Sequence, residues 1–400
     1  MKNSNEEILN FNKGRKADML KFKFKAMGES AFVFYRGTAH LFYQDLPVDA
    51  PILNAPPVWV CGDLHLENYG SFKGDNRVAY FDINDFDEST LTSALIDPAR
   101  LITSIYVASD FLKINKEQAE SLTHSFLEIY AHNLAQGYIR HLEQESSEGI
   151  IKKFLKQVQK RKQNEFVGGR VEQRNHKPHL IIDNVKTLPV SKQIKQQVSE
   201  AIGEWAENQD DPKYFRIQDM AYRVAGTGSL GVERYVLLIE GKGKSDNLLL
   251  DLKEAKPSAV ETFLKTQPYP HFHSEAKRVE ELQKRVQPVP PALLSTVELN
   301  KKSFVLRELQ PTSDKMDLTL LAGKPKKLAE LLESMAQTLA WGQLRSGGRQ
   351  GSSTADALIE FGKNSIDWKK NVSDFAKDYS TKVKSDYKGY VKAYNKGYFK

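Results

Sequence analysis

The clearest pattern of hydrophobic and polar positions lies in residues 58–88, which predict two strands with polar loops at their ends. The apolar run 58–61 predicts the first strand, and a polar loop follows it. A Lys-Gly-Asp-Asn turn at 73–76 then leads into a second strand at 77–81, as a hairpin requires. Three carboxylates follow this strand: Asp82, Asp85 and Asp87. Carboxylates and amides at the ends of paired strands predict an oxygen-ligand site of the kind that Mg²⁺ prefers.

Elsewhere, hydrophobic positions recur at helical spacing or gather in short β-rich runs. The helical patterns cover 12–27, 97–112, 117–140, 146–164, 274–286, 328–344 and the last forty residues. The β-rich runs cover 232–240, 248–252 and 304–309. We therefore expect an α+β fold in which the later strands form a sheet of their own.

Composition narrows the class of protein. The 400 residues are enough for two lobes with real cores, and 27% charged with 40% apolar residues is an ordinary soluble balance. A membrane-spanning helix needs about 20 apolar residues, and no run approaches that length, so we expect no membrane span. The first twenty residues lack the apolar core of a signal peptide. Cys61 is the only cysteine, which excludes an intrachain disulfide and fits a reducing cytoplasm.

The net charge of +7 is concentrated in the last forty residues. Residues 361–400 contain ten Lys and four Asp, and a basic tail can hold nucleic acid or anionic lipid. A solvated helix face is the commoner meaning of such a pattern, however. Four tyrosines share one rough face of this segment, at a spacing more typical of packing than of base stacking: Tyr387, Tyr390, Tyr394 and Tyr398. We therefore expect no nucleic-acid partner.

Within 58–88, the polar residues have the spacing of kinase catalytic and metal loops. Kinases place an Asp, four further residues and an Asn in one loop, and a metal-binding Asp after a later hairpin. Asp63 and Asn68 have the first spacing, and Asp85 follows the hairpin. Asp63 would accept the proton of an attacking hydroxyl. We assign catalytic roles to Asp63, His65 and Asn68, and metal ligation to Asn68, Asp85 and Asp87. A polar turn region with solvated acids is the alternative.

A glycine-rich stretch at 226–231 predicts a second part of the same site. It contains G-x-G-x-x-G, but the residues after it are β-rich, whereas a Rossmann turn should open a helix. Strands around a Gly-rich turn, followed by a lysine, are typical of the loop that covers the phosphates in kinases. Lys253 would neutralise the α- and β-phosphates, with Lys256 as a second candidate, and would pair with Glu280 or Glu281. The predicted nucleotide-binding residues are Gly226, Gly228, Ser229, Gly231 and Lys253. An ordinary glycine-bearing hairpin is the alternative.

Five segments together resemble one bacterial family. They are Tyr-Arg-Gly at 35–37, Gly-Asp-Leu-His-Leu-Glu-Asn-Tyr-Gly at 62–70, Asn-Asp-Phe-Asp-Glu at 84–88, Gly-Thr-Gly-Ser-Leu-Gly at 226–231 and Lys-Glu-Ala at 253–255. In this order, over most of the chain, they resemble the family known as domain of unknown function 2252, which is grouped with the protein-kinase-like superfamily. Its Gly-Asp-Leu-His loop is similar to that of aminoglycoside and choline phosphotransferases. The resemblance implies kinase-like roles for Asp63, Asn68 and Asp85, and it names no substrate.

The order of the motifs differs from that of ordinary kinases, in which the Gly-rich hairpin precedes the catalytic loop. A circularly permuted, two-lobed, protein-kinase-like fold would reconcile the two orders, because close termini make such rewiring tolerable. We therefore expect four regions. They are an N-terminal helical segment at 1–50, a large-lobe-like region at 51–210, a small-lobe-like sheet with a helix at 211–310, and a helical region at 311–400 that closes on the large lobe.

These motifs favour an ATP- and Mg²⁺-dependent phosphotransferase whose acceptor is an unidentified hydroxyl-bearing small molecule. Transfer of AMP by the same fold is a variant of this hypothesis. One alternative is a nucleotide-binding module without catalysis, against which the retention of Asp63, Asn68, Asp85 and Lys253 argues. The other is a metallophosphoesterase that uses Asp63 and His65 as a metal pair, although the chain contains no Gly-Asn-His for a second metal.

Overall fold

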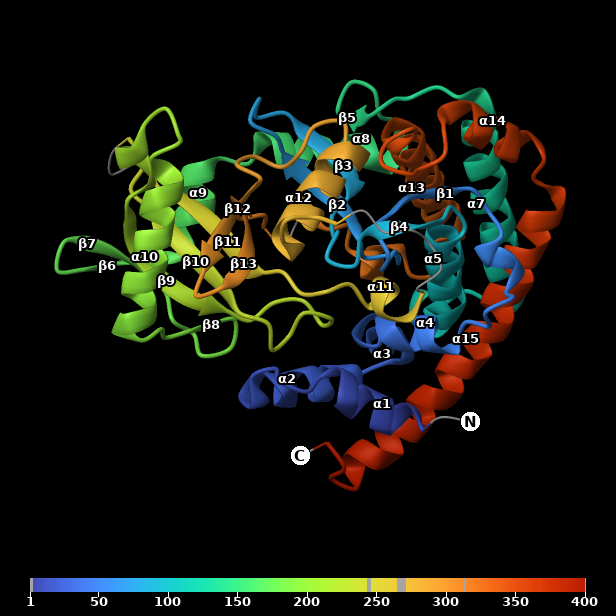
Figure 1. Ribbon diagram of the computed structural model, residues 1–400, viewed down its shortest axis with the longest axis horizontal. Helices are drawn as coiled ribbons and strands as arrows, with labels where there is room; N and C mark the ends of the chain where they lie inside the picture. The colour runs from blue at the N-terminus through green and yellow to red at the C-terminus, as the bar shows by residue number, and fades with distance from the viewer. Residues whose placement is uncertain (1–2, 243–245, 265–270, 312–313, 400) are drawn as a thin grey trace.

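A computed structural model describes residues 3–242, 246–264, 271–311 and 314–399. The structure contains both many helices and several antiparallel sheets, so the expected α+β class is confirmed. Figure 1 shows the largest sheet at one end of the molecule and most of the long helices at the other, with α12 (Glu275–Val286) between them.

The largest sheet has six antiparallel strands in the order β12-β13-β11-β10-β9-β8. Their bounds are Thr187–Leu188 (β8), Ile217–Arg223 (β9), Arg234–Ile239 (β10), Leu248–Glu254 (β11), Ser295–Leu299 (β12) and Lys302–Glu308 (β13). The three β-rich runs of the sequence are β10, β11 and β13, so their prediction as strands is confirmed.

Elements on both faces of this sheet explain why its central strands, β10 and β11, contain runs of consecutive apolar residues. The covering elements are α10 (Lys192–Ala206) on one face, and α9 (Gln163–Gly168), β6 (Val171–Arg174) and β7 (Lys177–Leu180) on the other. Leu237 belongs to the core under α10, whereas its neighbours Val236 and Leu238 belong to the core on the opposite face. A strand that is buried on both sides needs apolar residues at every position.

Two small sheets carry the predicted catalytic and metal loops. In one, β1 (Pro57–Val60) pairs with β4 (Thr90–Ser93). In the other, β3 (Ala79–Ile83) lies between β2 (Tyr69–Lys73) and β5 (Leu142–Glu143). The predicted hairpin is confirmed as β2–β3, but its second strand begins at Ala79 because Arg77, with φ of 61°, still belongs to the turn. Loop 61–68 joins β1 to β2 and loop 84–89 joins β3 to β4, so both loops leave the ends of paired strands.

Eight further helices belong to the fold outside the N-terminal segment. They are α5 (Ile96–Val107), α6 (Ser109–Leu112), α7 (Lys116–Gln136), α8 (Gly149–Lys160), α11 (Ala259–Phe263), α13 (Pro325–Ser346), α14 (Ala355–Lys363) and α15 (Ile366–Asn395), with 3-10 turns at Pro51–Leu53, Pro212–Phe215 and Leu318–Leu321. Every residue of α5 is buried. Helix α15 packs along α5, and α13 packs along α7 (Figure 1).

The two ends of the chain meet on one side of the molecule, as Figure 1 shows. The N-terminal helices are α1 (Ser4–Phe11), α2 (Ala17–Met27), α3 (Ala31–Gly37) and α4 (Ala39–Asp45). The hydroxyl of Tyr390 on α15 donates to the carbonyl oxygen of Phe24 at 2.7 Å, and Tyr387 donates to Gly28 at 2.9 Å. Tyr390 is fully buried, so the predicted packing role is confirmed for this residue, whereas Tyr398 is 47% exposed.

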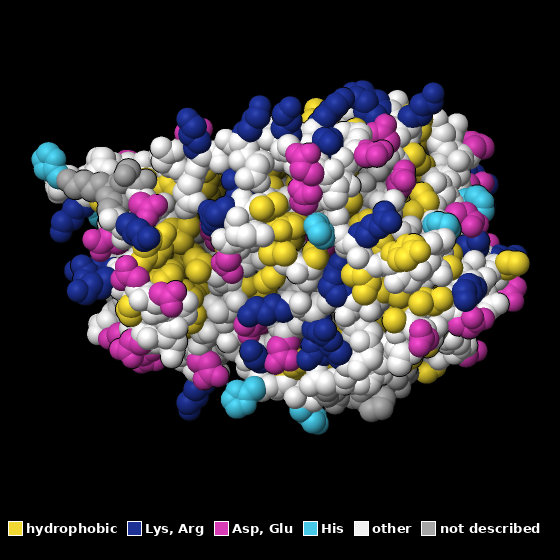
Figure 2. Space-filling model, turned by 90° about the horizontal axis from the view of Figure 1, so that it is seen from above, with side chains coloured by type: hydrophobic (Ala, Val, Ile, Leu, Met, Phe, Trp, Pro, Cys, Tyr) yellow, Lys and Arg dark blue, Asp and Glu magenta, His cyan; other side chains and the backbone are white. Residues whose placement is uncertain are grey.

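The lysines of the basic tail also have partners within the chain. Four of them on α15 form ion pairs with acids of other helices: Lys369 with Glu128, Lys377 with Glu120, Lys382 with Asp45 and Lys384 with Asp110. Figure 2 shows basic and acidic side chains interspersed with hydrophobic ones over one face of the molecule. In the described part of the chain, no helix has the length and apolar character to cross a membrane.

The burial of α5 leads to a stability prediction. Leu101 on this helix has 0% of its surface exposed, whereas Leu320 is 63% exposed. Leu101→Ala should lower the free energy of unfolding by about 2–5 kcal/mol, because it leaves a cavity among packed side chains. Leu320→Ala should change it by less than about 0.5 kcal/mol. Urea denaturation of the two variants measures both values, and similar values would contradict the packing described for α5.

Candidate active site

Two adjoining cavities lie between the small-sheet loops and the loop that joins β9 to β10. The inner chamber, of about 90 Å³, is lined by Asp63 and His65 and by residues from the first helices of the chain. The outer chamber, of about 420 Å³, is lined by Lys253 and by arginines of the large sheet. Both chambers share seven residues: Arg36, Asn68, Asp85, Gly226, Thr227, Ser229 and Lys315. The predicted catalytic, metal and glycine-rich loops therefore meet at one place, although they lie far apart in the sequence.

Helix α5 fixes the start of the predicted catalytic loop, 61–68, through hydrogen bonds to its backbone. The carboxylate of Asp97 accepts hydrogen bonds from the backbone N–H groups of Cys61 at 2.8 Å and Gly62 at 3.0 Å. Burial raises the pKa of Asp97 to about 6. Gly62 has φ of 82°, and a side chain there would collide with the carbonyl of Glu88. Only glycine at this position lets loops 61–68 and 84–89 approach each other.

One turn after Asp97, the same helix supplies the partner of Asp63. The guanidinium of Arg100 forms an ion pair with the Asp63 carboxylate, and Arg100 itself is fully buried. It lies 4.7 and 4.9 Å from the ring centres of Tyr35 and Phe42, contacts that favour its charge. Burial raises the pKa of Asp63 to about 7, and Arg100 opposes the rise. Asp63 is thus oriented by a fixed charge and has a pKa suited to proton exchange near neutral pH.

Asn68 and His65 are held by hydrogen bonds inside the loop itself. The amide nitrogen of Asn68 donates to the backbone carbonyl of Asp63, which leaves the amide oxygen for a cation. The Nδ1 of His65 accepts a hydrogen bond from the N–H of Glu67 at 3.1 Å, so the ring proton is assigned to Nε2. Burial lowers the pKa of His65 well below its usual range, and the ring is neutral.

Lys253 connects the large sheet to the metal loop. Its ammonium forms an ion pair with the carboxylate of Asp87 and lies 3.9 Å from Asp85. Asp85 keeps 46% of its side-chain surface exposed, and it lines both chambers. Burial alone would raise the pKa of Asp85, but Lys253 and then Arg307 outweigh it and lower that pKa. Asp85 is therefore ionised and open to a ligand.

The expected pair between Lys253 and a glutamate of α12 does not form. Glu280 contacts Lys277 and Lys284, at 2.9 and 2.6 Å, and Glu281 contacts Arg285 at 2.8 Å. The prediction was wrong because both glutamates have basic neighbours three or four residues away on their own helix, which compete locally for them. The acids of loop 84–89 take their place as partners of the lysine.

The glycine-rich loop is tied to the start of the chain. The carbonyl oxygen of Gly228 accepts hydrogen bonds from Arg15 at 2.7 Å and Lys23 at 2.9 Å, and Leu230 accepts one from Arg15 at 3.2 Å. Gly226 and Ser229 line both chambers, and Gly228 lines the inner one. Gly231 lines neither; it has φ of 92° and lies against Arg15, so its part is to turn the chain.

The outer chamber is rich in arginine, which the sequence patterns did not reveal. Asp251 lies between Arg223, at 3.0 Å, and Arg234, whose Nε lies at 2.8 Å. Arg307 and Lys315 complete the cations of this wall. The strand period could have indicated the position of Asp251. Asp251 and Lys253 are two residues apart on β11, so their side chains lie on the same face of the sheet, the one that lines the chamber.

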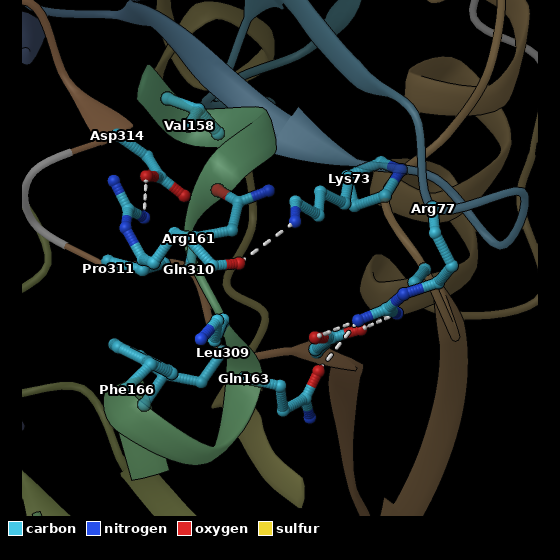
Figure 3. Close-up of a pocket in the computed structure, with 14 residues that line it drawn as sticks. Lys73, Arg77, Val158, Arg161, Gln163, Phe166, Leu309, Gln310, Pro311 and Asp314 are labelled. Carbon is cyan, nitrogen blue, oxygen red and sulfur yellow. Dashed lines mark hydrogen bonds and ion pairs between the residues drawn. The ribbon is translucent and has the colours of Figure 1, made fainter. Parts of the chain in front are cut away.

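A third hollow adjoins the outer chamber and shares Gln310, Pro311 and Asp314 with its wall. Figure 3 shows its basic side chains turned toward partners within the wall. Arg161 pairs with Asp314, and Arg77 pairs with Glu308 and donates to Gln163 at 2.7 Å. None of the predicted site residues lines this hollow.

Comparison with known proteins gave one family. The family model described as "Uncharacterized protein conserved in bacteria (DUF2252)" matches residues 15–393. Neither the curated proteins nor the solved structures contained a match.

The buried charges of the outer chamber lead to a prediction about stability and pH. Burial alone would raise the pKa of Asp251, but Arg234 and Arg223 hold it well below its usual range. Asp251→Asn leaves two arginines without a counter-charge, so the free energy of unfolding at pH 7 should fall by about 3–5 kcal/mol. Because the folded-state pKa is depressed, this contribution exists above the ordinary pKa of about 3.9 and is lost below it. Urea denaturation from pH 7 downward should show the two proteins converging in acid. The exposed Glu298→Gln should match the wild type throughout, and an Asp251→Asn variant as stable as this control would contradict the prediction.

Proposed function

The chain belongs to the bacterial DUF2252 family, and from its site we propose that it is an ATP- and Mg²⁺-dependent phosphotransferase that acts on a hydroxyl-bearing small molecule. The observation that carries the proposal is the meeting of the catalytic loop, the metal loop and the glycine-rich loop around two adjoining chambers. The ammonium of Lys253, 3.9 Å from Asp85, joins the two halves of this arrangement. Positioned charges around a polyphosphate are the main requirement of phosphoryl transfer.

The residues at the junction of the chambers fit Mg²⁺. Asp85 is ionised and exposed, Asp87 lies on the same loop, and the free oxygen of Asn68 belongs to the same wall. Hard oxygen ligands of this kind suit Mg²⁺, which usually completes its coordination with phosphate oxygens and water. The ammonium of Lys253 lies near both Asp85 and Asp87, which indicates that positive charge is favourable at this position. Bound Mg²⁺ would neutralise phosphate charge.

Asp63 is the proposed general base. A base whose pKa lies near 7 is ionised at neutral pH and still accepts a proton effectively. Arg100 orients its carboxylate, and Asp97 fixes the backbone on which Asp63 sits. Neutral His65 can donate a hydrogen bond through Nε2 to an oxygen in the inner chamber. Lys253 and the arginines of the outer chamber are placed to hold phosphates, and the glycines of 226–231 let phosphates approach the backbone.

The same features support a kinase-like, circularly permuted fold as part of the proposal. Loops 61–68 and 84–89 correspond to large-lobe loops, and the large sheet with Lys253 corresponds to the small lobe. The metallophosphoesterase alternative would use Asp63 and His65 as metal ligands. In this site, Asp63 is paired with Arg100 and Nδ1 of His65 accepts from a backbone N–H. These observations favour transfer over hydrolysis.

Nucleotide binding is the first test of the proposal. ATP with Mg²⁺ should raise the melting temperature, because a ligand that binds only the folded state stabilises it. Lys253→Ala should weaken ATP binding, measured by calorimetry, by about tenfold or more, since it removes one charged hydrogen-bond donor. The exposed Lys213→Ala should bind as the wild type does. If the protein bound no ATP with either Mg²⁺ or Mn²⁺, the proposed function would be wrong.

Transfer itself is the second test. ATP labelled at the γ- or the α-phosphate is incubated with the protein and a pool of cell metabolites, and the label is followed into acceptors. γ-Label should move, and Asp63→Asn should slow it about 10²–10⁴-fold while ATP binding is retained. Asp85→Ala should abolish transfer and weaken Mg²⁺-dependent binding. Transfer of the α-label instead would identify AMP transfer, and binding without any transfer would favour the inactive module.

The pH profile gives an independent test of Asp63 as the base. Because only ionised Asp63 accepts a proton and its pKa is raised to about 7, kcat/KM should rise with pH up to about 7 and then level off. Arg100→Met, which removes the opposing charge, should move the midpoint to higher pH. A profile that is flat from pH 5 to 9 would exclude Asp63 as the base.

A further inference from the structure

The N-terminal segment contributes two basic side chains to the inner chamber. Arg15 precedes α2 and Lys23 lies on it, and both line this chamber together with Asp63 and Gly228. Lys23 has 0% of its surface exposed, and Arg15 is half-buried. Nothing in the sequence patterns distinguished these two residues from the other basic residues of the segment.

Neither residue has a carboxylate partner in the described part of the chain. Their hydrogen bonds go to neutral backbone oxygens, those of Gly228 and Leu230. Other buried cations of this site have acids beside them, as Arg100 has Asp63 and Arg234 has Asp251. Burying a cation without a counter-charge is unfavourable, and it is seldom kept unless something compensates for it.

The unfavourable burial of the two charges also affects the pKa values of both groups. Burial lowers the pKa of Lys23 well below its usual range, and the nearby charge of Arg15 lowers it further. Burial also lowers the pKa of Arg15, with Glu88 opposing. An anion in the chamber would offset both effects. Strongly perturbed groups that line a cavity are common at binding sites.

The position of the glycine-rich loop indicates where the anion would lie. One oxygen, the carbonyl of Gly228, accepts from both Arg15 and Lys23. A phosphate oxygen is a stronger acceptor for two cations than a neutral carbonyl is. Because Gly226 and Gly228 have no side chains, the loop can shift so that a phosphate oxygen replaces the Gly228 carbonyl without a steric clash.

We infer that Arg15 and Lys23 form an anion-binding subsite for the phosphate group nearest Asp63, the terminal phosphate of a polyphosphate ligand. The N-terminal segment is therefore part of the binding site and not only a cover for it. A nucleoside triphosphate as the ligand rests on the proposed function. The subsite itself requires only a polyphosphate, so inorganic triphosphate is the simplest probe.

The test compares Lys23→Met with Lys25→Met, an exposed lysine on the same helix. Calorimetry measures binding of inorganic triphosphate, AMP, ADP and ATP with Mg²⁺. Lys23→Met should weaken binding of triphosphate and ATP by about tenfold or more, the effect of one charged hydrogen bond. It should change AMP binding by less than about twofold, and Lys25→Met should leave every ligand unaffected.

The melting temperature without ligand separates a binding role from a structural one. If Lys23 only ties down the loop, Lys23→Met should lower the melting temperature. If it is kept for an anion, the variant should be at least as stable as the wild type, because a buried charge has been removed. Should Lys23→Met fail to fold, Arg15→Gln against the exposed Lys13→Gln repeats the same comparison.

Several outcomes decide between this inference and the proposed function. Equal binding of triphosphate by wild type and Lys23→Met overturns the inference, as does a wild type that binds no triphosphate, even if ATP binds. Binding of triphosphate that depends on Lys23, together with no binding of ATP, leaves the inference standing and overturns the proposed function. If Lys23→Met weakened the binding of AMP and ATP by the same factor, the inference would also be overturned, because Lys23 would then make no contact specific to the terminal phosphate.

Discussion

The site depends on one turn of a buried helix. Asp97 and Arg100 lie three residues apart on α5, so they project from the same face toward the catalytic loop. One accepts the N–H groups of Cys61 and Gly62, and the other pairs with the carboxylate of Asp63. Because every residue of α5 is buried, the Asp97 carboxylate and the Arg100 nitrogen that faces Asp63 take their partners from the loop and not from solvent. These contacts hold the loop in one conformation.

Most of the buried cations that line the two chambers form ion pairs. Arg100, Lys253 and the two arginines around Asp251 each have an acid beside them. Such pairs, once buried, are costly to break. The pair of Lys253 with Asp87 joins the large sheet to loop 84–89, so it helps to fix how these two parts sit against each other. Arg15 and Lys23 depart from this rule, because they have only backbone oxygens as partners. Among the described residues, Arg15 and Lys23 thus bring positive charge without an ion-pair partner to the wall of the inner chamber.

The meeting of loops 61–68 and 84–89 also has a steric condition. A residue larger than glycine at position 62 would collide with the backbone at Glu88. With glycine there, Asp63 and Asp85 line the same chamber, and Lys253 reaches the metal loop from the other side. The proposed phosphotransferase chemistry needs this convergence, since the general base, the metal ligands and the phosphate-binding groups act on one small volume.

The sequence by itself determined the features that depend on neighbouring residues. These include the β2–β3 hairpin, the strands β10, β11 and β13 of the large sheet, and the spacing of Asp63 and Asn68, whose side chain bonds within its own loop. Turn chemistry and hydrophobic period act over a few residues, so they can be read locally. The partner of Lys253, the roles of Asp97 and Arg100, and the arrival of Arg15 and Lys23 at Gly228 were decided only by the tertiary structure. Each joins groups tens to hundreds of residues apart, and which charges become neighbours depends on how the whole chain packs.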